Sequence, residues 1–327
     1  MAEEIWDRVL GLVDQGRLEE AFEQAEAHRD EIPDSPQAHL LLGVVQAQMG
    51  DIEDALESFD EALSLDPSFE LARLEKARIL YDEELFEDVI ETLEESKGAE
   101  ASLLLASALY ELGENEESES RLALALAEGE TAEMRQLEAT LRLARAARDD
   151  ALVSAERSVS LDPEDPVSHY VLGLVLTQRG ELDRADSAFR RAEELDPDTH
   201  FCPSRLDGEE FDEAVDAAVA ELPEEFQSFL ENVEIAVEEV PDPGLIREGV
   251  EFDVLGLYQG STIQSEGWDL PDRILLFQRN LENISPDRQT LLEEIRTTVH
   301  HEIAHHMGMD EEAVRDAEGS TDDPDPE

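Results

Sequence analysis

The chain has 327 residues, of which 41% are hydrophobic, so it is long enough for two domains with packed cores. Its 85 Asp and Glu residues against 24 Lys and Arg give a formal net charge of −61. Such a surface repels phosphate backbones and anionic lipids, so we expect binding neither to nucleic acid nor to membranes.

The chain contains one cysteine, Cys202, which excludes an internal disulfide. No stretch approaches the ~18 consecutive apolar residues of a membrane span, and no signal peptide is visible. We therefore expect a cytoplasmic protein. The acidity has two explanations that the sequence leaves open: a surface that binds basic partners, or adaptation to a high-salt cytoplasm.

Two segments far apart in the chain share one pattern of residues. The pattern consists of a proline, a glycine, two alanines with a phenylalanine between them, and a second proline. In the first segment these are Pro36, Gly43, Ala55, Phe59, Ala62 and Pro67, and in the second they are Pro166, Gly173, Ala185, Phe189, Ala192 and Pro197. The small residues allow two helices to pack closely, and the last proline stops the second helix. This pattern resembles the tetratricopeptide repeat.

More degenerate copies occupy the rest of residues 1–197, which we predict to hold about six helix pairs. A single pair cannot bury its apolar face alone, so the pairs are expected to stack into an all-α solenoid. The first helix of each pair lines a concave groove suited to a peptide or a partner helix of another protein. With so acidic a chain, we expect that ligand to be basic.

Residues 198–208 contain Pro203 and Gly208 and read as a linker. Beyond it the periodicity indicates mixed elements in a domain over residues 209–317. We predict a helix over 209–222, strands over 233–237, 256–260 and 273–277, and a long helix over 286–306. Ser285 is the expected N-cap of that helix, with Pro286 at its first position.

The final helix carries the pattern HExxH as His301, Glu302 and His305. Residues four apart face the same way on a helix, so both imidazoles can bind one zinc ion. Glu302 lies beside them and can reach a water at the metal rather than the metal itself. An apolar face of the helix, made of Leu292, Ile295, Val299 and Ile303, is expected to pack against the domain core.

A catalytic zinc takes three protein ligands, so a third must come from elsewhere. Gly308 permits a sharp turn after the helix, and Glu311 then follows His305 at the spacing of the third ligand in related sites. Asp310 and Glu312 are the alternatives for this third ligand. Glu294, two turns before the motif, is a more remote candidate.

Four segments of residues 209–317 resemble the small bacterial zincin-like metallopeptidase family. They are LPEE at 222–225, LGLY at 255–258, LPDRI at 270–274 and TVHHEIAHHMGMDEE at 298–312. The resemblance implies a small α+β zincin core following the repeats, with one Zn²⁺ per chain held by His301, His305 and an acidic third ligand. Residues 318–327 are expected to form a disordered acidic tail.

The resemblance implies hydrolysis of a peptide or protein substrate, with Glu302 as the general base. In zincins an edge strand above the helix aligns the substrate, and residues 273–277 are the candidate strand. Tyr258 is a candidate transition-state stabiliser. The alternative function is a non-catalytic interaction scaffold whose zincin domain is structural or vestigial.

Overall fold

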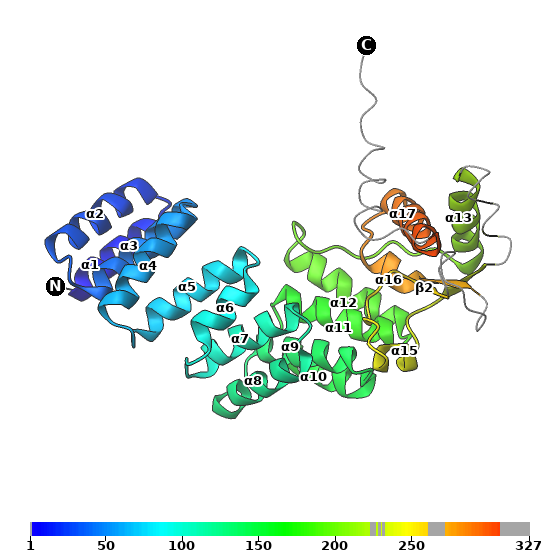
Figure 1. The fold of residues 1–327 in the computed structure, drawn as a ribbon, viewed down its shortest axis with the longest axis horizontal. Helices are drawn as coiled ribbons and strands as arrows, with labels where there is room; N and C mark the ends of the chain where they lie inside the picture. The colour runs from blue at the N-terminus through cyan, green and yellow to red at the C-terminus, as the bar shows by residue number, and fades with distance from the viewer. Residues whose placement is uncertain (1, 223–226, 228–229, 231–232, 261–271, 308–327) are drawn as a thin grey trace, which may run out of the picture. The chain divides into compact units, whose positions relative to one another are not determined.

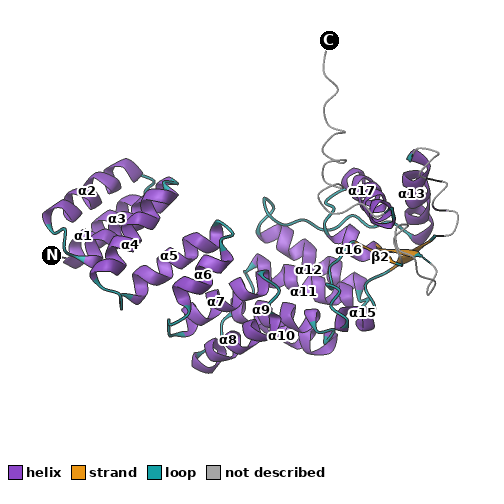
Figure 2. Cartoon of the chain, in the orientation of Figure 1, coloured by secondary structure: helices purple, strands orange, loops and turns teal. Residues whose placement is uncertain are grey.

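The computed structural model describes residues 2–222, 227, 230, 233–260 and 272–307 (Figure 1). The chain forms two compact units, Met1–Glu130 and Thr131–Glu327. Helices dominate the described residues, and the strands belong to the second unit (Figure 2). None of the described helices combines the length and the apolarity needed to cross a membrane.

The first unit is a run of helix pairs in which each helix contacts the next one along the chain. The pairs are α1 (Ala2–Asp14) with α2 (Leu18–Glu31), α3 (Pro36–Met49) with α4 (Ile52–Leu65), α5 (Glu70–Asp82) with α6 (Phe86–Leu93), and α7 (Ala99–Glu111) with α8 (Asn115–Glu128). Helix α3 shows how the sequence sets the ends of these helices. The Ser35 hydroxyl accepts from the Ala38 amide, Pro36 occupies the first turn, and Gly50 ends the helix with φ 85°.

The second unit begins with two more helix pairs. They are α9 (Ala132–Ala144) with α10 (Arg148–Leu161), and α11 (Pro166–Gln178) with α12 (Leu182–Leu195). The contact that defines the repeat has the same geometry in both units. A Cβ on Gly43 would lie 2.6 Å from the Phe59 ring, and a Cβ on Gly173 would lie 2.6 Å from the Phe189 ring. The two glycines therefore let each phenylalanine pack closely against the first helix of its pair, as the shared pattern indicates.

The remainder of the second unit is a small α+β domain. Its elements are α13 (Gly208–Glu221), β1 (Glu234–Glu238), α15 (Pro243–Arg247), β2 (Gly256–Gln259), β3 (Arg273–Phe277), α16 (Gln278–Asn283) and α17 (Arg288–His306). The strand order is β1-β3-β2, with β1 parallel and β2 antiparallel to β3. In register, Leu275 of β3 lies between Ala236 of β1 and Leu257 of β2. The predicted combination of a helical repeat array and a small α+β domain is confirmed.

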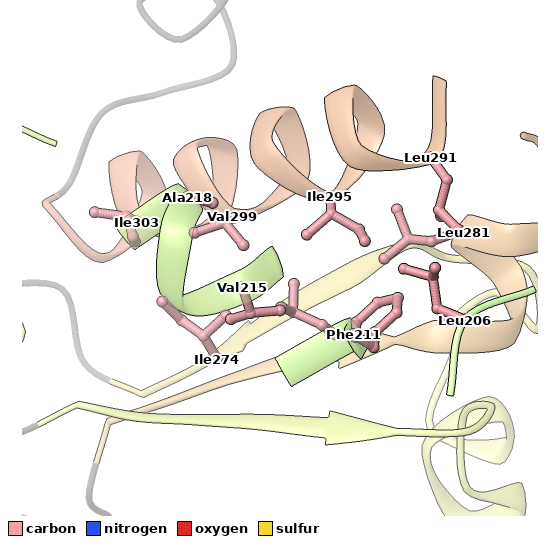
Figure 3. Close-up of a cluster of buried hydrophobic side chains, with 11 residues drawn as sticks. Leu206, Phe211, Val215, Ala218, Ile274, Leu281, Leu291, Ile295, Val299 and Ile303 are labelled. Carbon is pink, nitrogen blue, oxygen red and sulfur yellow. The ribbon is translucent and has the colours of Figure 1, made fainter. Parts of the chain in front are cut away.

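One core cluster holds this domain together (Figure 3). Helix α17 lies across α13 and the sheet and sends one apolar row into the core, namely Leu291, Ile295, Val299 and Ile303, each at most 2% exposed. The prediction of Leu292 in this row is wrong, because Leu292 is 38% exposed. The buried row repeats every four residues from Leu291, which places Leu292 beside the contact rather than in it.

Two further expectations about local structure are corrected. The N-cap of α17 is Asp287, whose carboxylate accepts from the Thr290 amide at 2.9 Å, and not Ser285. Ser285 is buried and donates its hydroxyl proton to the Leu281 carbonyl at the end of α16. Strand β3 is also not an edge strand, because it pairs on both sides. Among the described residues, β1 and β2 form the edges of this sheet.

Residues 201–207, which precede α13, have no regular secondary structure but are tied to the domain. Leu206 is buried in the core cluster, and its amide donates to Glu282 Oε1 at 3.1 Å. Arg205 donates to Asp186 of α12 at 2.9 Å and to Glu282 of α16 at 3.0 Å. The Glu282 side chain has no exposed surface, so these hydrogen bonds compensate for the burial of its charge.

Candidate metal centre

Helix α17 presents the two motif histidines side by side. His301 Nε2 and His305 Nε2 lie 2.9 Å apart, and the ring centroids lie 4.6 Å apart at an interplanar angle of 75°. Two imidazole nitrogens bound to one tetrahedral zinc at about 2.0–2.1 Å lie about 3.3 Å apart. The pair therefore fits one zinc ion after an opening of a few tenths of an ångström, and its nitrogen donors are of the type that zinc prefers.

Glu302, between these histidines in sequence, faces strand β2 rather than the core. Its side chain lies against Gly256, where a Cβ would approach Glu302 Cγ and Oε1 to 2.8 Å. The same Cβ would approach Thr298 Cγ2, one turn earlier on α17, to 2.8 Å. The residue is only 7% exposed. Glycine at position 256 thus allows strand β2 to cover the Glu302 carboxylate.

The neighbouring His300 serves the scaffold. Its Nε2 lies 2.9 Å from the Ala218 carbonyl oxygen of α13, within hydrogen-bonding distance. This contact joins α17 to α13 next to the motif. His300 therefore contacts α13 and helps to set the position of α17.

The described residues place no third candidate metal ligand with His301 and His305. Within the described ranges, no cluster of three or more His, Cys, Asp or Glu side chains could hold a metal ion, so Glu294 does not join His301 and His305. Glu311 and its alternatives Asp310 and Glu312 lie outside the described residues. The assignment of the third ligand stays a prediction.

Tyr258, the candidate transition-state stabiliser, lies on β2 two residues after Gly256. Its hydroxyl donates to Asp272 Oδ1 at 2.9 Å, and its ring packs against the core cluster. Burial and the adjacent Asp272 carboxylate both raise the pKa of the Tyr258 hydroxyl well above its ordinary value. Tyr258 therefore stays protonated and remains a hydrogen-bond donor at neutral pH.

Models of two kinds of known family match separate parts of the chain. Residues 230–320 match the zincin-like metallopeptidase model, and residues 36–69 and 137–199 match two tetratricopeptide repeat models. The chain joins a tetratricopeptide repeat array to a zincin-like metallopeptidase domain. The match to the zincin-like family covers the sheet, the HExxH helix and the predicted third ligand.

Solved structures that resemble the chain are repeat proteins. PilF of Pseudomonas aeruginosa aligns with a TM-score of 0.53 and 16% identity, over 61% of this chain and 93% of its own. A tetratricopeptide repeat protein of Parabacteroides merdae aligns with a TM-score of 0.50 and 16% identity, over 61% of this chain and 80% of its own. These likenesses establish the fold of the array alone. Among proteins of curated function, none matches the chain in sequence.

Sequence reasoning missed two contributors to the site. Gly256 lies within the LGLY segment of the family resemblance, but only the approach of β2 to α17 shows that this position must lack a Cβ. Asp272 precedes β3 in sequence, and the pairing of β3 with β2 brings it to Tyr258. A glycine that begins a predicted strand was the available signal for the first.

Proposed function

We propose that this protein is a zinc-dependent peptidase whose repeat array recruits a substrate or a partner protein. One observation carries the proposal: the Nε2 atoms of His301 and His305 lie 2.9 Å apart, and Glu302, which follows His301 on the same helix, is buried against Gly256 of β2. A structural zinc site is usually closed by four Cys or His ligands and needs no buried glutamate beside it. A hydrolytic site needs such a base.

We assign one zinc ion per chain to His301 and His305, with Glu311 as the third ligand and Asp310 or Glu312 as its alternatives. Zinc in this position supplies the positive charge that acidifies water and polarises a substrate carbonyl. Glu302 accepts a proton on its carboxylate from the attacking water and passes it to the leaving amine. Coverage by β2 limits the access of bulk water to that carboxylate, which strengthens its electrostatic interactions.

Strand β2 is our candidate for substrate alignment, in place of residues 273–277. It is an edge of the described sheet, it runs antiparallel to β3, and it contacts α17 beside Glu302. An extended peptide can add to such an edge through backbone hydrogen bonds. Tyr258 on the same strand can stabilise the reacting oxygen only if its hydroxyl exchanges Asp272 for the substrate.

The proposal is tested by elemental analysis together with a peptide-cleavage screen on wild type and Glu302→Gln. We expect about one zinc per chain in both proteins, and cleavage by wild type that falls at least ~10³-fold in Glu302→Gln. Equal cleavage by both proteins would show that Glu302 is not the base. Zinc binding without cleavage of any peptide would favour the alternative function, a scaffold with a structural zincin domain.

A further inference from the structure

Two glutamines at the same repeat position have opposite environments. Gln48 follows Pro36 and Gln178 follows Pro166 at the same spacing, at the C-terminal ends of α3 and α11. Both helices are the first of their pair, which is the helix that lines the groove of a repeat array. Gln48 is exposed, whereas Gln178 is only 2% exposed. Something in the second unit therefore covers the end of α11.

The cover is a segment of the zincin-like domain. Gln178 Nε2 donates to the Phe252 carbonyl at 2.9 Å and to Asn280 Oδ1 at 3.0 Å. Asn280 Nδ2 in turn donates to the carbonyls of Phe252 at 3.0 Å and Val254 at 2.8 Å. Both amide side chains are buried, so losing one of their partners leaves an unsatisfied polar group.

Apolar contacts also join this segment of the zincin-like domain to the last repeat. Phe252 is 4% exposed, as is Ile246 of α15, and both belong to one core cluster with residues of α9, α10 and α11. Tyr170, Leu174 and Gln178 follow each other every four residues on α11 and line a cavity of about 120 Å³ together with Phe252 and Asn280. This face of the last repeat is thus occupied by the chain itself, as a peptide ligand would occupy it.

The covering segment leads directly into the candidate active site. Val254 precedes Leu255, whose carbonyl accepts from the Phe277 amide at 2.9 Å, and Gly256 begins β2. Gly256 is the residue whose missing Cβ makes room for the Glu302 carboxylate. A continuous series of hydrogen bonds and backbone therefore runs from α11 to the strand that covers Glu302.

We propose that the last repeat is part of the peptidase: Gln178 and Asn280 hold residues 252–254 and thereby position β2 above Glu302. This inference rests on the proposed function, and it makes both amides positioning residues rather than catalytic ones. It also divides the array, because the chain itself already covers this face of α11 and recruitment falls to the other repeats.

The test uses the full-length protein with Gln178→Glu and Asn280→Asp, which keep side-chain size but lose donors to the Phe252 and Val254 carbonyls. Gln178→Met provides a milder change without a buried charge, and Gln48→Glu is the matched control at the exposed position. Hydrogen exchange is measured for the amides of residues 254–259 and for those of α17, alongside zinc content and kcat.

We expect exchange in residues 254–259 to accelerate about tenfold or more in the Gln178 and Asn280 variants, with α17 and zinc content unchanged. The value of kcat should fall about tenfold in the same variants, and exchange in residues 254–259 should stay at the wild-type rate in Gln48→Glu. Equal acceleration in β2 and α17 would show that the contacts of residues 252–254 with α11 stabilise the whole domain rather than β2 in particular. That result would overturn the inference. Unchanged exchange in residues 254–259, or unchanged kcat in an active enzyme, would overturn it as well. If wild type cleaves no peptide, the proposed function fails, while the exchange data still decide whether the last repeat positions β2.

Discussion

Gly256 of β2 lies against the Glu302 side chain of α17, so closely that a Cβ on the glycine would lie 2.8 Å from Glu302 Oε1. Real Cβ atoms do not approach an oxygen to that distance without a shift of one partner. The strand therefore approaches the helix at this point only because its first residue has no side chain. The same approach that makes Glu302 a buried group also limits the directions in which its carboxylate can point.

We expect Gly256→Ala to displace the Glu302 carboxylate and to lower kcat about 10- to 100-fold, because small misplacements of a catalytic group are costly. Zinc content should stay at the wild-type value, since the added methyl group meets Glu302 and Thr298 rather than His301 or His305. Gly11→Ala is the control, because a Cβ at Gly11 would meet nothing within 4 Å. Wild-type kcat in Gly256→Ala would disprove the constraint.

Substitutions at three neighbouring histidines should have different effects on zinc content and on stability. His301→Ala and His305→Ala should lose zinc, because each removes one of the two paired nitrogen donors. His300→Ala should keep zinc and lose about 1 kcal/mol of stability, because it removes the contact with the Ala218 carbonyl. Elemental analysis and urea unfolding measure the two effects. Loss of zinc in His300→Ala together with its retention in His301→Ala would reverse the assignment.

The repeated glycine–phenylalanine contact predicts equal behaviour of two distant substitutions. Gly43→Ala and Gly173→Ala each place a methyl group 2.6 Å from a buried phenylalanine ring. We expect each to cost about 1–3 kcal/mol from overpacking, partly offset by the helix propensity of alanine, which is worth about 1 kcal/mol. Urea unfolding of each full-length variant checks this. A second change, Phe59→Leu, should recover stability in Gly43→Ala but not in Gly173→Ala.

The net charge of −61 predicts that ligands of the array are basic. A Lys- and Arg-rich peptide should bind the full-length protein more tightly than an acidic peptide of the same length. Its Kd should rise about tenfold between roughly 50 and 500 mM NaCl as screening shortens the range of the charges. Fluorescence anisotropy measures both quantities. Equal affinity for the two peptides, or no dependence of Kd on salt, would show that charge does not determine which ligand the array binds.

A thermal melt in dilute buffer separates the two explanations of the acidity. A sharp, cooperative transition without added salt would reject adaptation to a high-salt cytoplasm. Partner choice or solubility would then remain as the explanation of the charge. Loss of the folded state at low salt, restored equally by NaCl and KCl, would indicate that self-repulsion must be screened for folding.

Features set by neighbouring residues along the chain follow from the amino-acid sequence by itself. The spacing of Gly43 and Phe59, repeated in Gly173 and Phe189, identifies the helix pairs, because the short period of the α-helix fixes which residues of a segment share one face. The HExxH spacing places His301 and His305 together for the same reason, and the fold brings their Nε2 atoms within 2.9 Å. Period-two alternation indicates the strand near 234–238, and short apolar segments next to Pro or Gly indicate the strands at 273–277 and near 256–259.

Predictions from local sequence were wrong where two nearby residues suit the same role, and could not be made where contacts between distant segments determine the structure. Ser285 and Asp287 are both good N-caps, and burial of Ser285 at the end of α16 leaves the role to Asp287. The central position of β3 depends on its pairing with β1 and β2, which lie far from each other in sequence. Gln48 and Gln178 hold the same repeat position, yet only Gln178 is buried, because residues 252–254 and Asn280 fold back onto α11. Periodicity reports which face of an element is buried, whereas the identity of what covers that face depends on long-range contacts that no local pattern encodes.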